Sequence, residues 1–347
     1  MSAFPTPDEG ARTQALTRQS MLTKPAGALG RLERLSAWVC AVQGTCPPRP
    51  FAHPSLAIFA GDHHIARTAG TSAYPPEVTA QMVLNFFAGG AAANVLARQF
   101  GVSVHVVDVS VDADPDYANQ RDPQIAARRI RRGSGAIDVE DAMSESECLA
   151  AIELGREIAD QLIDEGADLL IPGDMGIGNT TPAAALIGAF TGRHAQEVTG
   201  RGTGIDDAVL ARKTSVIETA LHRVSALHGD DILRTIGGPD IAAMSGFLEQ
   251  AARRRTPVLL DGVVSCAAAL ATRAREPGCQ AWWAAGHLST EPAAAIALES
   301  LGLVPILDLD LRLGEGTGAL LSLPIVEAAI LTLSEMATFE SAGVSDR

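Results

Sequence analysis

Short apolar runs alternate with longer amphipathic stretches along most of this 347-residue chain. Six of the runs have the length of a strand buried on both faces, and most of them stop at Gly, Asp or Pro. They are Ser55–Ala60, Val102–Val109, Asp168–Pro172, Pro257–Asp261, Ala281–Ala285 and Val304–Leu309. This pattern predicts a mostly parallel sheet of about six strands.

Between these runs, apolar residues recur at steps of three and four, which is the period of a helix with one buried face. The predicted helices are Glu77–Arg98, Ser144–Glu165, Asp206–Leu227, Asp240–Arg254, Ser265–Arg275 and Glu291–Leu301. Strands that alternate with helices favour a doubly wound α/β fold with a parallel sheet.

Both ends of the chain are helical and contain no strand pattern. Ala11–Leu22 and Ala28–Val42 have helical spacing before a proline-rich connector, and Thr317–Ala337 is an apolar helical stretch interrupted by Pro324. We therefore predict a small helical domain from residues 1–45 and 320–347. Residues 46–319 would form a large Rossmann-like catalytic domain.

Composition limits the partners. The chain is 47% hydrophobic but only 4% aromatic, so its core must be built from aliphatic residues. Its formal net charge of −14 repels phosphate backbones, so we expect neither nucleic acid nor an anionic membrane as a partner. A phosphate-bearing ligand would have to be held by backbone N–H groups, a helix start or a single lysine.

Cysteine usage and the N-terminal sequence favour a cytoplasmic protein. The five cysteines are scattered and form no CxxC pair, as expected for reduced thiols. The first ten residues lack the basic and apolar regions of a signal peptide. No uninterrupted apolar run reaches the roughly 18 residues that span a membrane.

In open α/β sheets the ligand lies beyond the carboxyl ends of the strands, so the segments that follow strands are the candidate sites. One of them, PGDMGIGNTTP (residues 172–182), runs from a strand into a helix. Gly176 and Gly178 allow a tight turn with exposed N–H groups, and Thr180 and Thr181 supply hydroxyls at the helix start. This is a phosphate cradle in physical terms, although it lacks the P-loop spacing and such loops are as often structural.

A second glycine loop, TGRGTGIDD (residues 199–207), precedes a predicted helix that carries Lys213. Gly200, Gly202 and Gly204 suit an anion, and the lysine supplies a point charge that can reach a phosphate. A flexible turn with a solvated lysine explains the same residues equally well.

A single carboxylate, Glu315, lies between Gly314 and Gly316 in the segment LDLRLGEGTGA (residues 309–319). The flanking glycines let another molecule approach the carboxylate closely. A carboxylate at a helix start is a possible structural role. The apolar helix that follows has little need of one, so we predict that Glu315 is catalytic.

Two further observations bear on metals. The segment AGDHHIA (residues 60–66) places Asp62, His63 and His64 after a strand, but adjacent histidines point apart and no third ligand follows, so we expect no metal site. The chain also lacks an acidic pair directly after a strand of the kind that holds magnesium and phosphoribosyl pyrophosphate. A phosphoribosyl donor without pyrophosphate fits better, and we expect no cofactor.

Seven ordered segments resemble the nicotinate-nucleotide–dimethylbenzimidazole phosphoribosyltransferase family. They are KPAGALGRLE (24–33), GDHH (61–64), PEVTAQMV (76–83), GDMGIGNTT (173–181), GRGTG (200–204), GPDIAAM (238–244) and LRLGEGTG (311–318). The resemblance implies transfer of phosphoribosyl from nicotinate mononucleotide to 5,6-dimethylbenzimidazole or a related base. It also implies a homodimer and a role in the assembly of the cobalamin nucleotide loop.

The resemblance assigns roles to individual residues. It makes Glu315 the general base and places the base substrate near Gln81, Met82 and Leu313. The nucleotide phosphate and ribose would be held by the two glycine loops and Lys213. The implied substrate-binding residues are Asp174, Gly176, Gly178, Asn179, Thr180, Gly202, Lys213, Gln81, Met82, Leu313, Gly314 and Gly316. Many family members have Glu where this chain has Asp174, so that carboxylate is one methylene shorter here.

Three other functions are compatible with parts of this pattern. A phosphoribosyltransferase of the same fold could act on a purine or a phenolic acceptor, and the pocket around Gln81, Met82 and Leu313 would decide. A nucleotide-binding sensor could keep the cradle, but the intact Glu315 speaks against it. A dinucleotide oxidoreductase is weakened by the missing third glycine of the fingerprint.

Overall fold

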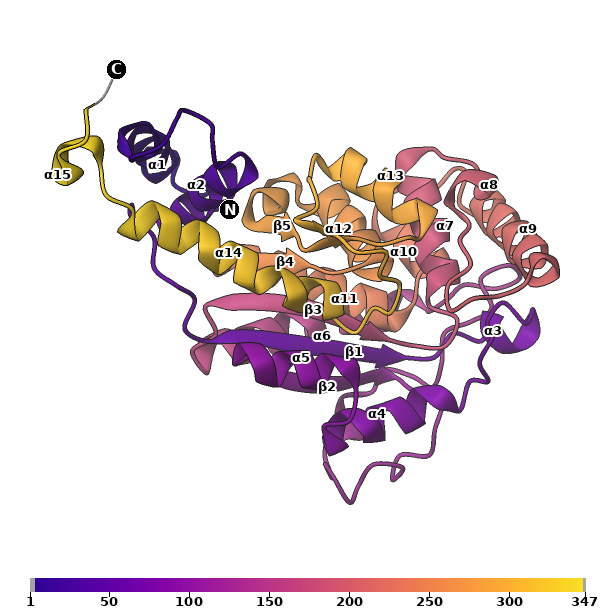
Figure 1. Cartoon of the computed structure of the whole chain (residues 1–347). Coiled ribbons are helices and arrows are strands. Elements are labelled where there is room, and N and C mark those ends of the chain that lie inside the picture. The colour runs from indigo at the N-terminus through magenta and orange to yellow at the C-terminus, as the bar shows by residue number, and fades with distance from the viewer. Residues whose placement is uncertain (1–3, 346–347) are drawn as a thin grey trace.

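A computed structural model describes residues 4–345 (Figure 1). Its main sheet has five strands in the order β2-β1-β3-β4-β5, and every neighbouring pair is parallel. The strands are β1 (Pro54–Gly61), β2 (Ser103–Ser110), β3 (Leu169–Met175), β4 (Val258–Leu260) and β5 (Trp283–Ala285). The predicted doubly wound, parallel α/β fold is confirmed. The order reverses between β1 and β3, and ligands bind beside such a reversal in doubly wound sheets.

The sixth predicted run does not join the main sheet. Only Leu307 and Asp308 of the run Val304–Leu309 form a strand, β7, which pairs with β6 (His287–Leu288) in a separate parallel sheet of two strands. Pro305 has no N–H to donate to a neighbouring strand, which shortens the strand from its start. Because β6 follows β5 after one residue, Gly286, the small sheet continues the edge of the large one.

Helices cover both faces of the sheet (Figure 1). On one face, α11 (Pro239–Arg253) packs against β1, β2 and β3 and also against α6 (Glu145–Asp164) and α12 (Val263–Arg275). On the other face lie α4 (Val78–Ala88), α5 (Ala92–Phe100) and α14 (Thr317–Glu335). The remaining helices are α3 (Ile65–Thr68), η1 (Ile125–Arg128), α7 (Thr180–Thr191), α8 (Ala195–Val198), α9 (Asp207–Arg223), α10 (Asp230–Ile236), η2 (Pro277–Trp282), α13 (Pro292–Leu301) and α15 (Phe339–Ala342).

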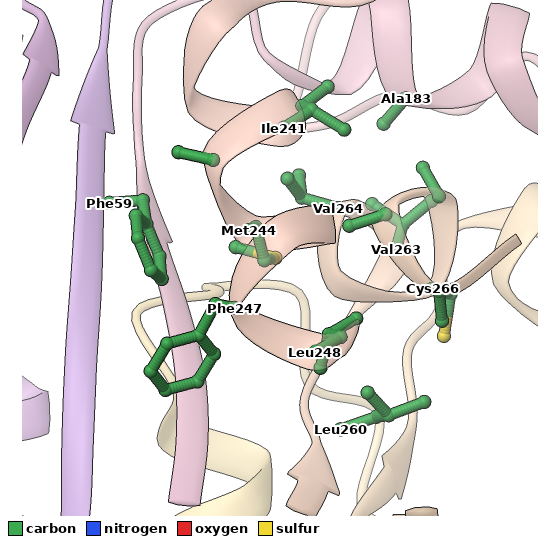
Figure 2. Close-up of a cluster of buried hydrophobic side chains, with 14 of the residues drawn as sticks. Phe59, Ala183, Ile241, Met244, Phe247, Leu248, Leu260, Val263, Val264 and Cys266 are labelled. Carbon is green, nitrogen blue, oxygen red and sulfur yellow. The ribbon is translucent and has the colours of Figure 1, made fainter. Parts of the chain in front are cut away.

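The core between sheet and helices is aliphatic, as the composition requires. Figure 2 shows side chains of α11 and α12 meeting those of β4 and α7. A rare aromatic contact joins Phe59 of β1 to Phe247 of α11, whose ring centroids are 5.3 Å apart at an interplanar angle of 71°. An edge-to-face pair of this kind adds to the stabilisation from burial.

Two glycines allow α6 and α11 to make the most extensive helix contact in the structure. A Cβ at Gly155 would lie 1.7 Å from the carbonyl oxygen of Ala243, and a Cβ at Gly246 would lie 1.9 Å from the carbonyl oxygen of Ile152. Each glycine therefore faces the backbone of the other helix. A side chain at either position would force the two helices apart.

Two predicted helices differ in the structure. The stretch Glu77–Arg98 is divided into α4 and α5 because Gly89 ends α4 in the left-handed conformation, with φ 76°. In contrast, α14 is continuous through Pro324. The stretches Val78–Phe100 and Thr317–Glu335 are apolar and long enough to cross a membrane. The first is two helices here, and both stretches pack against the sheet.

The two chain ends meet in a second, smaller core. Helices α1 (Glu9–Met21) and α2 (Arg31–Gln43) pack on α14, and Arg18 donates hydrogen bonds to the carbonyl oxygens of Leu333 and Ser334. This core contains Ala11, Ala15, Leu22, Ala37, Cys40 and Leu333. The first half of α14 belongs to the main core instead. The division into residues 1–45 plus 320–347 and residues 46–319 stays a prediction, with its second boundary inside α14.

The close approach of α6 and α11 predicts that Gly246→Ala lowers the free energy of unfolding by about 1–3 kcal/mol, because the added methyl forces the helices apart. Chemical denaturation of the variant and the wild type measures the difference. Ala150→Ser, on an exposed position of α6, is the control and should change stability by less than about 0.5 kcal/mol. Equal stability of Gly246→Ala and the wild type would contradict this account of the packing.

Candidate active site

A cavity of about 330 Å³ lies at the carboxyl ends of the strands. Its walls are the segments after β3, β4 and β6, the loop before α14, residues of the second glycine loop, and one side of α4. The lining residues are Tyr74, Val78, Met82, Asp174, Met175, Gly176, Ile177, Asn179, Thr180, Gly202, Thr203, Gly262, Val263, Val264, His287, Ser289, Glu291, Arg312, Leu313, Gly314 and Glu315. The structure thus brings nine of the thirteen predicted site residues to one cavity.

Glu315 has an unusual backbone conformation. It adopts φ 61° between Gly314 at φ 82° and Gly316 at φ 84°, so three consecutive residues are left-handed. For a residue with a side chain this conformation costs about 1–3 kcal/mol, and such strain concentrates at functional positions. The flanking glycines are needed for two reasons. They adopt positive φ without strain, and a Cβ at Gly316 would lie 2.5 Å from Cδ1 of Leu56.

Asp261, directly after β4, holds this strained loop in place. Its Oδ2 accepts a hydrogen bond from the backbone N–H of Gly316 at 3.1 Å. Its Oδ1 accepts from the N–H groups of Gly318 at 2.8 Å and Ala319 at 3.0 Å. These are free donors at the start of α14, where a carboxylate is stabilised by the helix dipole. Asp261 therefore ties the end of the sheet to the loop that carries Glu315.

The Glu315 carboxylate is suited to accept a proton. It is 4% exposed, and its Oε2 has no hydrogen-bond partner among residues 4–345. The pKa of Glu315 is raised to about 7, chiefly by burial and to a smaller extent by the nearby Asp261 carboxylate, while the backbone N–H of Ala93 acts in the opposite direction. A carboxyl with this pKa exchanges protons near neutral pH, as a general base must.

Asp174 is the second carboxyl group in the cavity. Its Oδ2 accepts a hydrogen bond from Nδ2 of Asn179 at 2.8 Å. Burial, followed by repulsion from Asp261 and Asp240, raises the pKa of Asp174 well above its usual range. A neutral Asp174 can donate a hydrogen bond and does not repel Glu315, so the two carboxyl groups can take different roles.

Lys213 supports the second glycine loop through hydrogen bonds. The lysine is fully buried on α9, and its Nζ donates to Oγ1 of Thr180 at 2.8 Å and to the carbonyl oxygen of Gly200 at 3.0 Å. Burial lowers the pKa of Lys213 to about 8. The lysine does not line the cavity, but it joins the two glycine loops through Thr180. A solvated lysine is therefore excluded.

The backbone N–H of Gly202, in the loop that the sequence suggested for anion binding, donates a hydrogen bond to a carboxylate of the protein itself. Oε1 of the buried Glu291 accepts a hydrogen bond from the backbone N–H of Gly202 at 2.7 Å. Arg312 donates to the carbonyl oxygen of the same residue at 2.9 Å. These contacts show that the loop can hold a negatively charged oxygen at Gly202, and that Glu291 takes this position in the structure.

Three other predicted residues lie outside the cavity lining. Gln81 is exposed on α4, where Val78 and Met82 line the cavity instead. Gly178, at φ 92°, packs against Ala66, and a Cβ there would lie 2.8 Å from the Cβ of Ala66. Gly316 supports the Glu315 loop through its hydrogen bond to Asp261. Their assignment to substrate binding stays a prediction.

The residues of the Asp-His-His segment have structural contacts. Oδ1 of Asp62 accepts from Oγ1 of Thr79 at 2.6 Å. The buried His63 lies between Asp240 Oδ2, 3.1 Å from Nε2, and Ser134 Oγ, 3.3 Å from Nδ1. Among residues 4–345, no three His, Cys, Asp or Glu side chains are grouped to hold a metal ion. The segment organises the end of β1 beside the cavity.

Three residues at the site were not predicted from the sequence: Asp261, His287 and Glu291. All three are buried. Asp261 directly follows β4, His287 begins β6, and Glu291 precedes α13. A signal was present for two of them, because Asp261 directly follows an apolar run and His287 follows one after a single glycine. None of the three lies between two glycines as Glu315 does, so none stood out from an ordinary helix start.

A doubly wound sheet with a carboxylate of raised pKa and glycine loops suited to an anion defines a nucleotide-binding transferase class. The family model described as "Phosphoribosyltransferase" matches residues 4–344. The nicotinate-nucleotide–dimethylbenzimidazole phosphoribosyltransferase of Mycobacterium avium is 57% identical over 342 residues, which are 98% of this chain and 96% of that protein. The Mycobacterium tuberculosis enzyme of the same name is 55% identical, over 99% of this chain and 94% of that protein.

Solved structures agree. The crystal structure of the enzyme of the same name from Thermus thermophilus has a TM-score of 0.90 and 40% identity, covering 98% of this chain and 100% of that chain. A structure of CobT from the same organism has a TM-score of 0.90 and 42% identity, covering 97% of this chain and 100% of that chain. The chain belongs to the nicotinate-nucleotide–dimethylbenzimidazole phosphoribosyltransferase family.

The raised pKa of Glu315 predicts a pH-dependent effect of Glu315→Gln on stability. The folded protein holds a proton on Glu315 up to about pH 7, while the unfolded chain loses it near pH 4.3. The wild type is therefore destabilised, relative to the variant, as pH rises between these values. At pH 8 the variant should be more stable by about 2–4 kcal/mol, and near pH 4 the two should be equal.

Denaturation at both pH values, with Glu299→Gln as an exposed control, measures the difference. A difference that is the same at pH 4 and pH 8 would show that the Glu315 carboxyl has an ordinary pKa.

Proposed function

We propose that this chain transfers the phosphoribosyl group of nicotinate mononucleotide to 5,6-dimethylbenzimidazole or a related base, giving an α-ribazole phosphate and nicotinate. This is the reaction that the names of its relatives describe. The observation that carries the proposal is Glu315, a strained, buried carboxylate in the cavity wall whose Oε2 has no hydrogen-bond partner in the described structure.

The chemistry requires one proton acceptor. One ring nitrogen of the benzimidazole attacks C1′ of the ribose, and the bond from C1′ to the nicotinate nitrogen breaks with its electron pair passing to that nitrogen. Nicotinate leaves as a neutral pyridine ring, so it needs no proton. The other benzimidazole nitrogen loses its proton to Glu315. Attack opposite the leaving group converts the β-linked sugar to the α configuration.

The two ends of the cavity suit the two parts of this reaction. Gly176, Asn179, Thr180 and Gly202 lie at the end where Lys213 supports the glycine loops, and we assign this end to the nucleotide phosphate and ribose. Backbone N–H groups and one buried lysine are the local devices that a chain of net charge −14 needs to hold a phosphate.

The other end of the cavity is apolar. Val78, Met82, Ile177 and Leu313 contribute side chains to its wall, and an aromatic base of low polarity would bury its ring against them. In our proposal Asp174 is neutral and donates a hydrogen bond to substrate. Its side chain is shorter than the Glu of many relatives, so it must act close to β3.

We also propose that the protein is a cytoplasmic homodimer. The apolar stretch Val78–Phe100 is only one-third buried, and Leu84 and Val95 within it are 37% and 50% exposed. Tyr74 and Leu313, at the cavity mouth, are also more than half exposed. Exposed apolar side chains on neighbouring helices often contact another protein surface, and a second copy of the chain is the occupant we propose.

Glu315→Gln should keep nicotinate mononucleotide binding within a few-fold of the wild type and reduce kcat by about 10²–10⁴-fold, because the amide cannot accept the proton. Titration calorimetry measures binding, and mass spectrometry of reactions with a panel of benzimidazole, purine and phenolic bases identifies the products. Near-normal turnover in this variant would rule out Glu315 as the base. Absence of any ribosylated product in the wild type would rule out the proposed function.

If α4 and α5 form the dimer contact, Leu84→Glu and Val95→Glu should convert the protein to monomers, since each buries a charge at the interface. Sedimentation velocity measures the state. Val139→Glu is the matched control, because Val139 is an apolar residue that is 76% exposed in a loop. A monomeric wild type at micromolar concentration would contradict the homodimer, and dimeric variants would place its interface elsewhere.

A further inference from the structure

His287 is a buried side chain for which the reaction scheme above has no use. It begins β6, is 2% exposed and lines the cavity. Within the described residues neither of its ring nitrogens has a hydrogen-bond partner. The nearest carboxylate oxygen, Oδ1 of Asp261, is 3.6 Å from Nε2 and already accepts two backbone hydrogen bonds. Leaving such a group unsatisfied is unfavourable, so a buried imidazole in this state points to a ligand.

The surrounding chain makes room for this imidazole. A Cβ at Gly318 would lie 1.9 Å from Cδ2 of His287, so only glycine fits at that position of α14. The second buried histidine, His63, shows what a structural role looks like in this protein, because both of its nitrogens have partners at 3.1 and 3.3 Å. His287 differs in having space and no partner.

His287 lies at the end of the cavity where the reaction takes place. Alternate residues of one extended segment, His287, Ser289 and Glu291, line the cavity. Glu291 binds the N–H of Gly202 at the phosphate end. His287 lies at the other end of this segment, beside Asp261, which also holds the loop of Glu315. A ligand group that meets His287 is therefore distant from the phosphate and near the bond that changes.

The chemistry of the donor nucleotide identifies that group, and this step rests on the proposed function. Near the reacting carbon the nucleotide carries the nicotinate ring, whose carboxylate is its only charged group besides the pyridinium and the phosphate. The other ionisable side chains in the lining are mostly acidic: Asp174, Glu291 and Glu315. Arg312 donates to the carbonyl oxygen of Gly202, at the phosphate end. His287 is thus the only buried basic side chain in the described lining that can receive a carboxylate at this end.

We propose that His287 donates a ring N–H hydrogen bond to the carboxylate of the nicotinate ring and thereby selects the acid over the amide of the donor nucleotide. Nε2 faces Asp261, and Nδ1, on the other edge of the ring, binds the substrate. In the complex the imidazole lies between the carboxylates of Asp261 and of the nicotinate ring. The nicotinamide nucleotide offers a neutral carbonyl instead, which accepts a weaker hydrogen bond.

The first test uses the wild-type protein. KM and kcat are measured with nicotinate mononucleotide and with nicotinamide mononucleotide, and the affinities of free nicotinate and nicotinamide are measured by calorimetry. We expect kcat/KM to favour the acid by about 10- to 100-fold, and nicotinate to bind more tightly than nicotinamide, as one charge-assisted hydrogen bond predicts. Equal affinities for nicotinate and nicotinamide would overturn the proposal without any variant.

The second test uses His287→Leu and His287→Met, whose side chains are of similar size but have no N–H to donate. Because the carboxylate is present before and during the reaction, its loss of a partner should raise KM for nicotinate mononucleotide by about 10- to 100-fold and leave kcat nearly unchanged. KM for the nicotinamide nucleotide should hardly change. His105→Gln, a half-buried histidine on β2 away from the cavity, is the control and should behave as the wild type.

The outcomes separate this proposal from the proposed function. If the wild type transfers phosphoribosyl and the variants keep the same preference for the acid, His287 is not the selecting residue. If the wild type forms no product, the proposed function fails, and the affinities of the wild type and the variants for free nicotinate still test the role of His287. If neither variant folds, equal affinities of the wild type for nicotinate and nicotinamide still overturn the proposal.

Discussion

The carboxylate of Asp261 is the contact on which the site depends. It accepts three backbone hydrogen bonds at the start of α14 and so fixes a helix that no strand precedes directly. Through Gly316 it holds Glu315 in a left-handed conformation that a free loop would leave. Through its charge it raises the pKa of both Glu315 and Asp174. One residue at the end of β4 therefore fixes the loop of Glu315 and adds to the effect of burial on the pKa of both carboxyl groups.

An acidic protein that binds a phosphate ester has to separate its charges along the cavity. Lys213 joins the two glycine loops through Thr180, and the carboxyl groups of Asp174 and Glu315 line the cavity beside them. Burial raises the pKa of both carboxyl groups, which reduces their negative charge near neutral pH and so their repulsion of an anionic substrate. Glu291 already accepts a hydrogen bond from the Gly202 N–H, the group to which we assign the substrate phosphate. A phosphate that binds to this N–H must therefore displace the Glu291 carboxylate.

Much of the fold follows from short-range patterns, and much of the site does not. Apolar runs located β1 to β5 and therefore the edge at which the ligand lies, and the two glycines beside Glu315 distinguished it from other acidic residues. The apolar run Val304–Leu309 resembled the other predicted strands, because the sequence of one strand does not show which strand it pairs with. The role of Asp261 depends on Gly316, which is 55 residues along the chain, and the space around His287 depends on the distant helix residue Gly318, so no pattern within a short segment predicts these contacts. Asp174 was recognised by resemblance, but its raised pKa comes from burial and from three other carboxyl groups, and only the fold produces both.

The hydrogen bonds of Asp261 also have a consequence for how the protein folds. They join residues 55 to 58 positions apart, across a segment that contains β5, β6 and β7. Contacts between such distant parts of a chain generally form after the local helices, because closing the intervening loop costs entropy, and the pairing of β1 with β3 spans a still longer segment. An intermediate with its sheet formed and α14 still unattached would leave Glu315 relaxed in solvent, with the ordinary acidity of a surface glutamate. Catalytic competence therefore depends on contacts between distant parts of the chain, and the return of activity after denaturation would follow the docking of α14 on the sheet.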